Sequence, residues 1–153
     1  MNNKLLHIKD FEHILALIQD ARSRTYAKAN AEMIMLYFNV GKVVSEKVNA
    51  GNWGENTVQE LAIFIASKQP ELSGFNRRGL YRMKQFYDTY SNPQFVSTVS
   101  TLLQNPEDKA AKFVSTLLTQ IQWSAHLHIL SKTKTAEEKI FYLNLTIEQK
   151  DRK

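Results

Sequence analysis

Apolar residues recur every three or four positions over most of the chain, and this spacing predicts helices. A first helix is predicted from Asp10, which is placed to cap it, to Ala21. A second, longer helix is predicted from about Tyr26 to Val48. Its apolar stripe consists of Tyr26, Met33, Tyr37, Val40, Val44 and Val48.

Three residues of the longer helix do not fit that stripe. Asn30 interrupts it where an apolar residue is expected, and a buried asparagine can set the register between packed helices. Ile34 and Phe38 lie to one side of it. We therefore expect this helix to pack against neighbours on more than one face.

A pair of helices follows, joined by a turn that contains glycine. The first is predicted over residues 55–68 and is stopped by Pro70. Its inward-facing residues are Val58, Leu61, Ala62 and Ile65. Asn76 is a good N-cap for the second, which is predicted from Arg77 to about Tyr90. The core stripe of that helix is Leu80, Met83, Tyr87 and Tyr90.

Residues 94–122 contain a weak internal repeat that is rich in serine, threonine and β-branched residues. The tetrapeptide Phe95-Val96-Ser97-Thr98 recurs as Phe113-Val114-Ser115-Thr116. The segment forms either a short hairpin or two helices around residues 105–108, and the pattern alone does not decide between them.

Two further helices are predicted towards the C-terminus. Ser124 is placed to cap a short one that runs through Leu130. Thr135 and Glu138 have the spacing of a capping box and open the last helix. The apolar residues of that helix are Ile140, Phe141, Leu143 and Ile147.

These elements predict a mainly α fold, a helical bundle that contains a helix-turn-helix unit of winged-helix-like type. We expect a single domain over residues 1–153. Its parts are a helical core with the helix-turn-helix at 10–93, a variable insertion at 94–122 that is open to a short hairpin, and C-terminal helices at 123–150.

Composition excludes several classes of protein. The 153 residues are 43% hydrophobic, which is typical of a folded domain, and include no cysteine, which excludes disulfides, thiolate metal sites and cysteine nucleophiles. No apolar run approaches the roughly 20 residues that span a bilayer, and the first residues lack the pattern of a signal peptide. A cytoplasmic protein without a membrane partner is therefore expected.

The net charge of +5 is modest, but positive charge gathers on the second helix of the pair. Arg77, Arg78, Arg82 and Lys84 lie within eight positions with no acidic residue among them. In a helix-turn-helix the second helix enters the major groove of DNA. The basic run therefore indicates either a DNA-contacting helix or an ordinary solvated face, and the pattern leaves both open.

The spacing within this helix suggests a role for each residue. Arg78, Arg82 and Gln85 fall at i, i+4 and i+7 and share one face. Arginine can bond guanine and glutamine can bond adenine. The side chains placed to bond phosphates or sugars are Asn76, Arg77 and Tyr81.

Five blocks of the chain resemble the N-terminal domain of the YhcG-type nucleases, and they occur in the same order as in that family. The block from Gly74 to Tyr87 is similar to the family's GFSxxNLxxMRxFY stretch. The remaining blocks are Leu36 to Lys42, Asn52 to Gly54, Ile121 to His126 and Ala136 to Leu145.

The resemblance implies a helical front domain that binds DNA. In full-length members of the family (domain of unknown function 1016) a C-terminal PD-(D/E)xK nuclease domain follows, and we expect this chain to lack it. Three positions depart from the family pattern. Asn76 replaces a serine that would also cap the helix, Gly79 replaces an asparagine and removes a polar group from the contact helix, and Ala125 replaces the first histidine of a Trp-Ser-His-His motif.

No catalytic constellation is predicted. The strings Glu137-x-Lys139 and Glu148-x-Lys150 match part of a PD-(D/E)xK motif, but both lie in a predicted helix instead of on a strand. His126 and His128 are two residues apart, so on a helix they point to different faces and form an incomplete metal site. We expect packing histidines, no cofactor and no metal.

The aromatic residues of the basic helix have two interpretations. Phe86, Tyr87 and Tyr90 could stack on bases, but beside Leu80 and Met83 at helical spacing they are typical of a core. Trp53 and Trp123 lie at turn-to-helix boundaries and are expected to anchor those turns.

The sequence thus predicts a DNA-binding module that positions a nuclease and performs no catalysis itself. The alternative is a protein-interaction or dimerisation module, because the long helix with Asn30 in its stripe could pair with a copy of itself. The two can coexist, since helix-turn-helix proteins often bind as dimers. The expected partners are DNA, the nuclease domain and a second copy of the chain.

Overall fold

A computed structural model describes residues 3–102 and 113–151, and these residues form helices connected by short segments. They contain no strand, so the mainly α fold is confirmed. The elements are α1 (Asn3–Asn49), α2 (Glu55–Lys68), α3 (Arg77–Ser91), α4 (Pro93–Leu102), the π-helical turn η1 (Phe113–Leu117), the 3-10 turn η2 (Leu118–Gln120), α6 (Trp123–Lys132) and α7 (Ala136–Asp151).

Residues 94–102 and 113–122 hold no strand, so the hairpin alternative is wrong there. Residues 94–102 belong to α4 instead. The turn expected at 105–108 lies outside the described residues.

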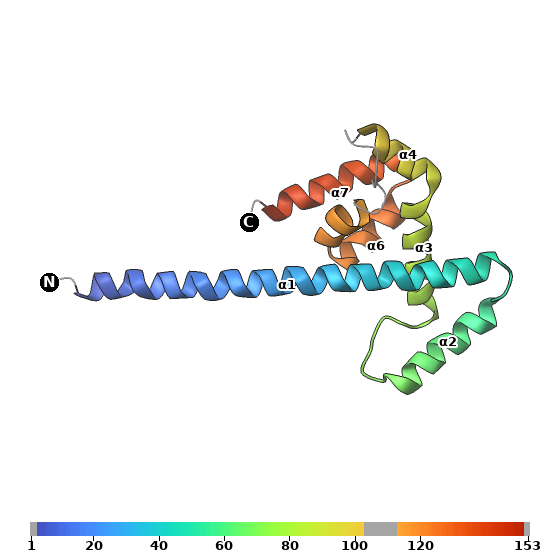
Figure 1. Cartoon of the computed structure of the whole chain (residues 1–153), viewed down its shortest axis with the longest axis horizontal. Helices are drawn as coiled ribbons and strands as arrows, with labels where there is room; N and C mark the ends of the chain where they lie inside the picture. Colours follow the sequence, from blue (N-terminus) through green and yellow to red (C-terminus); the bar gives the residue numbers. More distant parts are fainter. Residues whose placement is uncertain (1–2, 103–112, 152–153) are drawn as a thin grey trace.

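Helix α1 is one continuous helix of 47 residues and forms the long axis of the molecule (Figure 1). The prediction of two helices, one ending at Ala21 and one beginning at Tyr26, is wrong. The four residues between them, Arg-Ser-Arg-Thr, include neither glycine nor proline, so nothing in the backbone stops the helix. Asp10 consequently lies inside α1 and does not cap it.

The predicted stripe of α1 is buried only in its C-terminal part, and α1 packs on more than one face, as predicted. Ile34 is fully buried, whereas Tyr26 is 65% exposed and Met33 is 39% exposed. Val44 is buried as predicted. Tyr37, Val40 and Val48 of the stripe are partly buried beside Val44, whereas Ile34 packs on a second face of the helix. The stripe fails at Tyr26 because the N-terminal part of α1 has no neighbours.

Asn30 is used within the fold. Its side-chain amide donates to the carbonyl oxygens of Thr119 at 3.0 Å and Ile121 at 3.1 Å. These bonds hold η2 and the start of α6 against α1. Asn30 therefore sets the position of a neighbouring segment of the same chain, and its amide is not available to set register with a second copy.

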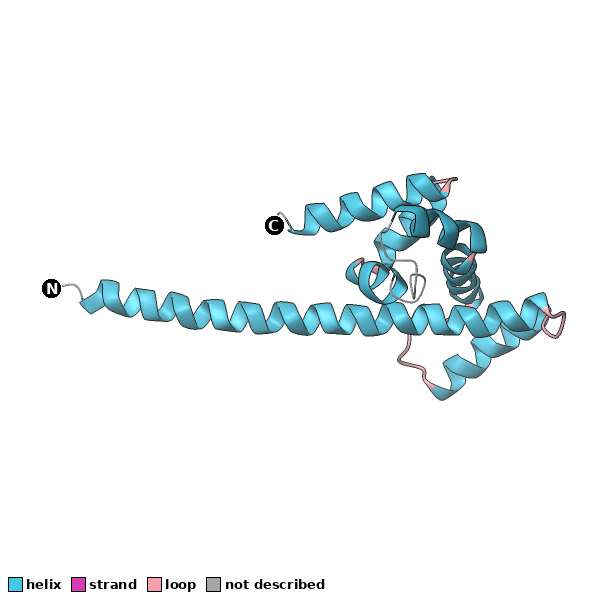
Figure 2. Ribbon diagram, turned by 45° about the horizontal axis from the view of Figure 1, so that its top comes forward, coloured by secondary structure: helices cyan, strands magenta, loops and turns pink. Residues whose placement is uncertain are grey.

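Helix α3 crosses α1 and joins the two sides of the molecule (Figures 1 and 2). Helix α2 lies on one side of α1, and α4, α6 and α7 lie on the other. At the crossing a Cβ added to Gly41 would lie 2.0 Å from the carbonyl oxygen of Met83. Glycine is required here because the two helix backbones approach too closely for any side chain.

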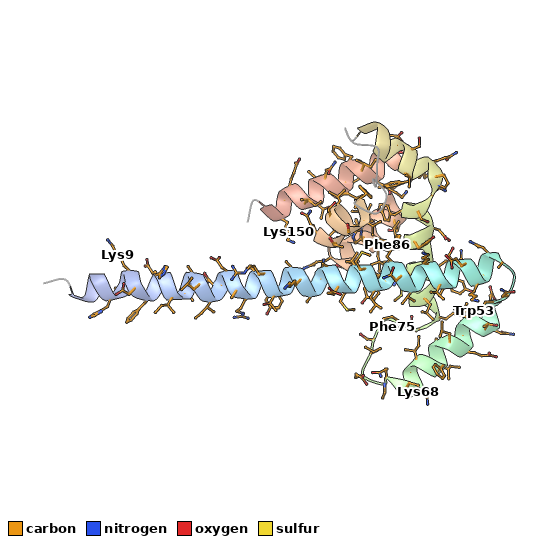
Figure 3. All side chains as sticks on the ribbon, in the orientation of Figure 1. Lys9, Trp53, Lys68, Phe75, Phe86 and Lys150 are labelled. Atoms are coloured by element: carbon orange, nitrogen blue, oxygen red, sulfur yellow. The ribbon has the colours of Figure 1, made fainter. Side chains whose placement is uncertain are left out.

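Two hydrophobic clusters occupy the two sides. The smaller one joins α1, α2 and the first half of α3 through Val44, Val58, Ala62, Leu80 and Met83. The larger one joins α1 and the second half of α3 to the C-terminal elements, and its largest buried members are Tyr90, Phe86, Ile34 and Leu118. Figure 3 shows the division, with Phe75 on the α2 side of α1 and Phe86 on the opposite side.

Tryptophan and capping residues mostly behave as predicted. Trp53 packs on the smaller cluster, and Trp123 packs on both. Thr135 Oγ1 accepts a hydrogen bond from the Glu138 N–H at 3.1 Å, as expected for a capping residue. Helix α6, however, begins at Trp123 with Gln122 as its N-cap residue, so Ser124 lies inside the first turn and is not the cap.

Candidate nucleic-acid interface

The start of α3 is fixed by three polar or small residues. The Oδ1 atom of Asn76 accepts a hydrogen bond from the Gly79 N–H at 2.8 Å, which confirms Asn76 as the N-cap. Gly74 in the preceding turn has a φ of +88°, a conformation that favours glycine. A Cβ added to Gly79 would lie 1.9 Å from the Gly74 carbonyl oxygen. The turn therefore folds back onto the first turn of α3, and Gly79 makes room for it.

The inner face of α3 packs in both clusters. Leu80, Met83, Phe86 and Tyr90 are all at most 1% exposed. Phe86 and Tyr90 are therefore core residues that cannot stack on bases, and Tyr87 is partly buried with its ring 5.0 Å from that of Phe38. This leaves the polar outer face of α3 as the surface that can meet a ligand.

That outer face lines an open hollow of about 560 Å³. Five of the residues predicted for nucleic-acid contact meet there, together with Glu55 from the first turn of α2: they are Arg77, Arg78, Tyr81, Arg82 and Gln85. The i, i+4, i+7 spacing thus brings Arg78, Arg82 and Gln85 to one surface, as the sequence predicted. We name these five residues the α3 basic face.

The guanidinium groups of this face are unpaired within the described residues. The single ion pair recorded in residues 3–102 and 113–151 joins Lys84 and Asp88, not any of these arginines. Glu55 lines the hollow, and no ion pair joins it to these arginines within the described residues. Sequence reasoning did not place Glu55 here, because its position depends on how α2 packs against α3.

Lys84 differs from the other predicted contact residues. Its ammonium group lies 2.8 Å from an Asp88 carboxylate oxygen, and the other oxygen of Asp88 accepts a hydrogen bond from Ser45 of α1. Lys84 is thereby held towards α1 and does not line the hollow. Asn76 lines a neighbouring hollow with Arg77 and Arg78 and is occupied in capping.

The helix pair occurs with nearly the predicted bounds, but its connection is long. Residues 69–76 join α2 to α3, whereas the turn of a helix-turn-helix usually has three or four residues. The assignment as a helix-turn-helix stays a prediction.

The two strings that resemble a nuclease motif are Glu137-x-Lys139 and Glu148-x-Lys150, and the lysine of each forms a hydrogen bond within the fold. Both strings lie in α7; the Lys139 Nζ donates to the Thr133 carbonyl oxygen at 3.2 Å and the Lys150 Nζ to that of Gln120 at 3.3 Å. In the described part of the chain no three histidine or acidic side chains gather as a metal site would require.

His126 is fully buried as a packing residue. Its Nε2 lies 2.8 Å from the Leu118 carbonyl oxygen and must carry the proton, because a carbonyl oxygen can only accept. Burial lowers the pKa of His126 to about 4 against the opposing effect of this hydrogen bond. His126 is therefore a neutral part of the core at neutral pH.

Fold and surface together define a mainly α-helical protein that carries a basic helix face beside an open hollow. The chain belongs to the DUF1016 N-terminal domain family, whose model matches residues 13–152. That model describes an N-terminal domain and no catalytic domain. Neither curated proteins nor solved structures match the chain. Among the described helices, none combines the length and the apolar character needed to cross a membrane.

Proposed function

We propose that this domain binds DNA through the α3 basic face and so positions an associated PD-(D/E)xK nuclease, without performing catalysis itself. The observation that carries the proposal is the meeting of Arg77, Arg78 and Arg82 around one open hollow, with no anionic partner among the described residues. Unpaired guanidinium groups that converge on an accessible concave surface favour a phosphate-bearing ligand.

The neighbouring side chains suit a duplex more than a free anion. Tyr81 and Gln85 add a hydroxyl and an amide to the three arginines on the same face. Arginine and glutamine are the residues that read guanine and adenine edges in the major groove, whereas tyrosine commonly contacts the backbone. The capped N-terminus of α3 lies at the same end of the helix and adds favourable partial positive charge.

The role in nuclease positioning rests on the family resemblance. Members of the family that this chain resembles join such a domain to a nuclease domain. The strings in α7 offer no substitute, because Lys139 is buried and both lysines bond backbone carbonyl groups. We therefore assign cleavage to the associated nuclease and targeting to this domain.

The direct test is fluorescence anisotropy of the purified chain with labelled duplex, single-stranded and branched DNA. The double variant Arg78→Ala/Arg82→Ala removes two arginines of the face. It should weaken binding to the preferred DNA at least tenfold, since each such contact contributes about 1–3 kcal/mol. The variant should remain folded because neither side chain is part of a hydrophobic cluster.

A matched control removes the same charge elsewhere. Lys132→Ala/Lys134→Ala lowers the net charge by two at exposed residues near the end of α6. Its affinity should stay within about threefold of the unchanged chain, because non-local charge is screened over about 10 Å. Equal losses in both double variants would show non-specific attraction to positive charge and would remove α3 as the binding element.

Self-association is the second candidate function, and one observation favours it. Asn30 cannot serve in it, because its amide is bonded within the fold. The N-terminal half of α1 nevertheless exposes large apolar side chains, among them Phe11 at 65%.

A further inference from the structure

The N-terminal half of α1 has no neighbour in the described structure. Every residue from His7 to Ala29 is exposed, and the helix extends away from the other elements in both views (Figures 1 and 2). An isolated helix in water is only marginally stable, because most helical stability in proteins comes from packing of an apolar face. This half of α1 therefore carries a helix without the packing that normally supports one.

Large apolar side chains form a line along this free half. Ile8, Phe11, Leu15 and Ile18 are separated by three, four and three residues, and each is between 46% and 65% exposed. This is the spacing of the contact positions in a pair of helices wound around each other. We call these four residues the α1 stripe. The same spacing continues through Arg22, Thr25 and Ala29.

Charge is segregated along the same segment. Residues 10–20 carry Asp10, Glu12 and Asp20 and no lysine or arginine, whereas residues 22–28 carry Arg22, Arg24 and Lys28 and no acid. Two parallel copies in register would place like charges together. Two antiparallel copies with the apolar positions aligned place Glu12 of each beside Arg22 of the other, so the segment is complementary to itself at this point.

We propose that the α1 stripe is an interface with a second copy of this chain, formed by antiparallel pairing of the two free helix halves. In the register that aligns the contact positions, Leu15 faces Ile18 of the other copy, Phe11 faces Arg22, and Ile8 faces Thr25. Each contact occurs twice, as two-fold symmetry requires. Arg22 can then lie over the Phe11 ring, and Glu12 flanks this contact beside Arg22.

The geometry of the chain permits this pairing. The exposed segment of 23 residues is about 35 Å long, at a rise of about 1.5 Å per residue. Antiparallel pairing places the two folded bodies at opposite ends of the shared helix pair. The α3 basic faces remain exposed, so this inference does not depend on the proposed DNA binding.

Sedimentation equilibrium of the full chain over a range of concentrations tests the interface. The unchanged chain should form dimers, and Leu15→Glu should raise the dissociation constant at least about tenfold by placing a carboxylate against Ile18. Leu17→Glu is the matched control: Leu17 is 55% exposed against 53% for Leu15, but it lies roughly 140° around the helix from the centre of the stripe. The control should change the constant less than threefold.

Urea denaturation must show that the packed part of the chain, with its two hydrophobic clusters, remains folded in each variant. Phe11→Ala provides a second variant that keeps high helix propensity, and it should also weaken the dimer. A chain that is monomeric at every concentration, or equal effects of Leu15→Glu and Leu17→Glu, would overturn the proposal. Binding of the monomer to anionic lipid vesicles through the stripe would overturn it in favour of a membrane surface.

Charge reversal tests the orientation. Arg22→Glu should weaken the dimer, because its carboxylate then lies beside Glu12 of the other copy across the antiparallel pair. Adding Glu12→Arg should restore the original dissociation constant. If Arg22→Glu leaves association unchanged, the antiparallel arrangement is wrong, because a parallel pair keeps like against like in either case.

Discussion

Two polar groups are buried at the larger hydrophobic cluster, the imidazole of His126 and the hydroxyl of Tyr90. His126 lies among the rings of Phe86, Tyr90 and Trp123, with centroid distances of 4.9, 6.3 and 6.4 Å. Its Nδ1 atom and the Tyr90 hydroxyl have no hydrogen-bond partner among the described residues. Burial raises the pKa of Tyr90 and lowers that of His126, so both groups stay uncharged at neutral pH.

The stability of the fold should therefore depend on pH through His126. Its pKa is about 4 when folded and about 6.5 when unfolded, so between these values the unfolded chain binds the additional proton. The free energy of unfolding should be fully retained above pH 6.5 and should fall as the pH drops towards 4. The total loss is on the order of 3 kcal/mol, at 1.36 kcal/mol per pKa unit.

Urea denaturation at several pH values measures this dependence. His126→Gln keeps a donor that can reach the Leu118 carbonyl oxygen but does not titrate, so the slope between pH 6.5 and 5 should flatten in that variant. An equal slope in both chains would mean that other groups cause the acid sensitivity.

Gly41 provides a test of the helix crossing. Gly41→Ala places a methyl group against the Met83 carbonyl oxygen, so α1 and α3 must separate, at a cost of about 1–3 kcal/mol in the free energy of unfolding. Gly54→Ala is the comparison variant: its added Cβ meets nothing within 4 Å, and its only expected effect is the weaker N-cap that alanine gives α2. Chemical denaturation should show the larger loss for Gly41→Ala; similar losses would contradict the close crossing.

At the scale of elements, the two halves of α3 contact different hydrophobic clusters. Its first half packs beside α2, its second half packs against α4 and α6, and its outer side carries the α3 basic face. The cap at Asn76 and the close turn at Gly74 determine where this helix begins. The position of the arginines therefore depends on the same few residues that start the helix.

Removal of the cap should destabilise the chain moderately. Asn76→Ala loses the Oδ1 acceptor for the Gly79 N–H and should lower the free energy of unfolding by about 1 kcal/mol. Asn76→Ser should retain nearly full stability, because serine caps helices about as well. Thermal and urea denaturation of the two variants check this, and equal stability of both would mean that the cap contributes nothing.

At the scale of the whole molecule, short-range patterns predicted the elements better than their arrangement. The bounds of α2 and α3 and the cap at Asn76 follow from spacing and turn residues, and they agree with the structure. The predicted core stripe of α3 is wrong at one position, because Phe86 is buried where Tyr87 was expected and Tyr87 is only partly buried. The break predicted within α1 is wrong. Where a helix has no neighbours its apolar residues need not keep one regular spacing, so an interruption of that spacing does not mark the end of the helix. The bonds of Asn30 depend on contacts some 90 residues apart, which no local pattern contains.

At the candidate site, too, local sequence patterns predicted one part of the arrangement, and distant contacts determine the other part. Helical spacing placed Arg78, Arg82 and Gln85 on one face, and the structure brings them to one hollow. Spacing alone could not show that Asp88 and Ser45 hold Lys84 towards α1, or that Gly79 makes room for the Gly74 carbonyl. Those facts depend on the crossing of α1 and α3 and on the return of the turn.

The central claim is that the α3 basic face binds DNA, and the salt dependence of duplex binding tests it most directly. Each phosphate neutralised by a cationic side chain contributes about −0.9 to the slope of log affinity against log salt concentration. Arg78→Ala/Arg82→Ala should therefore make the slope shallower by about 1.8, while Lys132→Ala/Lys134→Ala leaves it unchanged. A folded Arg78→Ala/Arg82→Ala variant with the slope and affinity of the unchanged chain would contradict the claim.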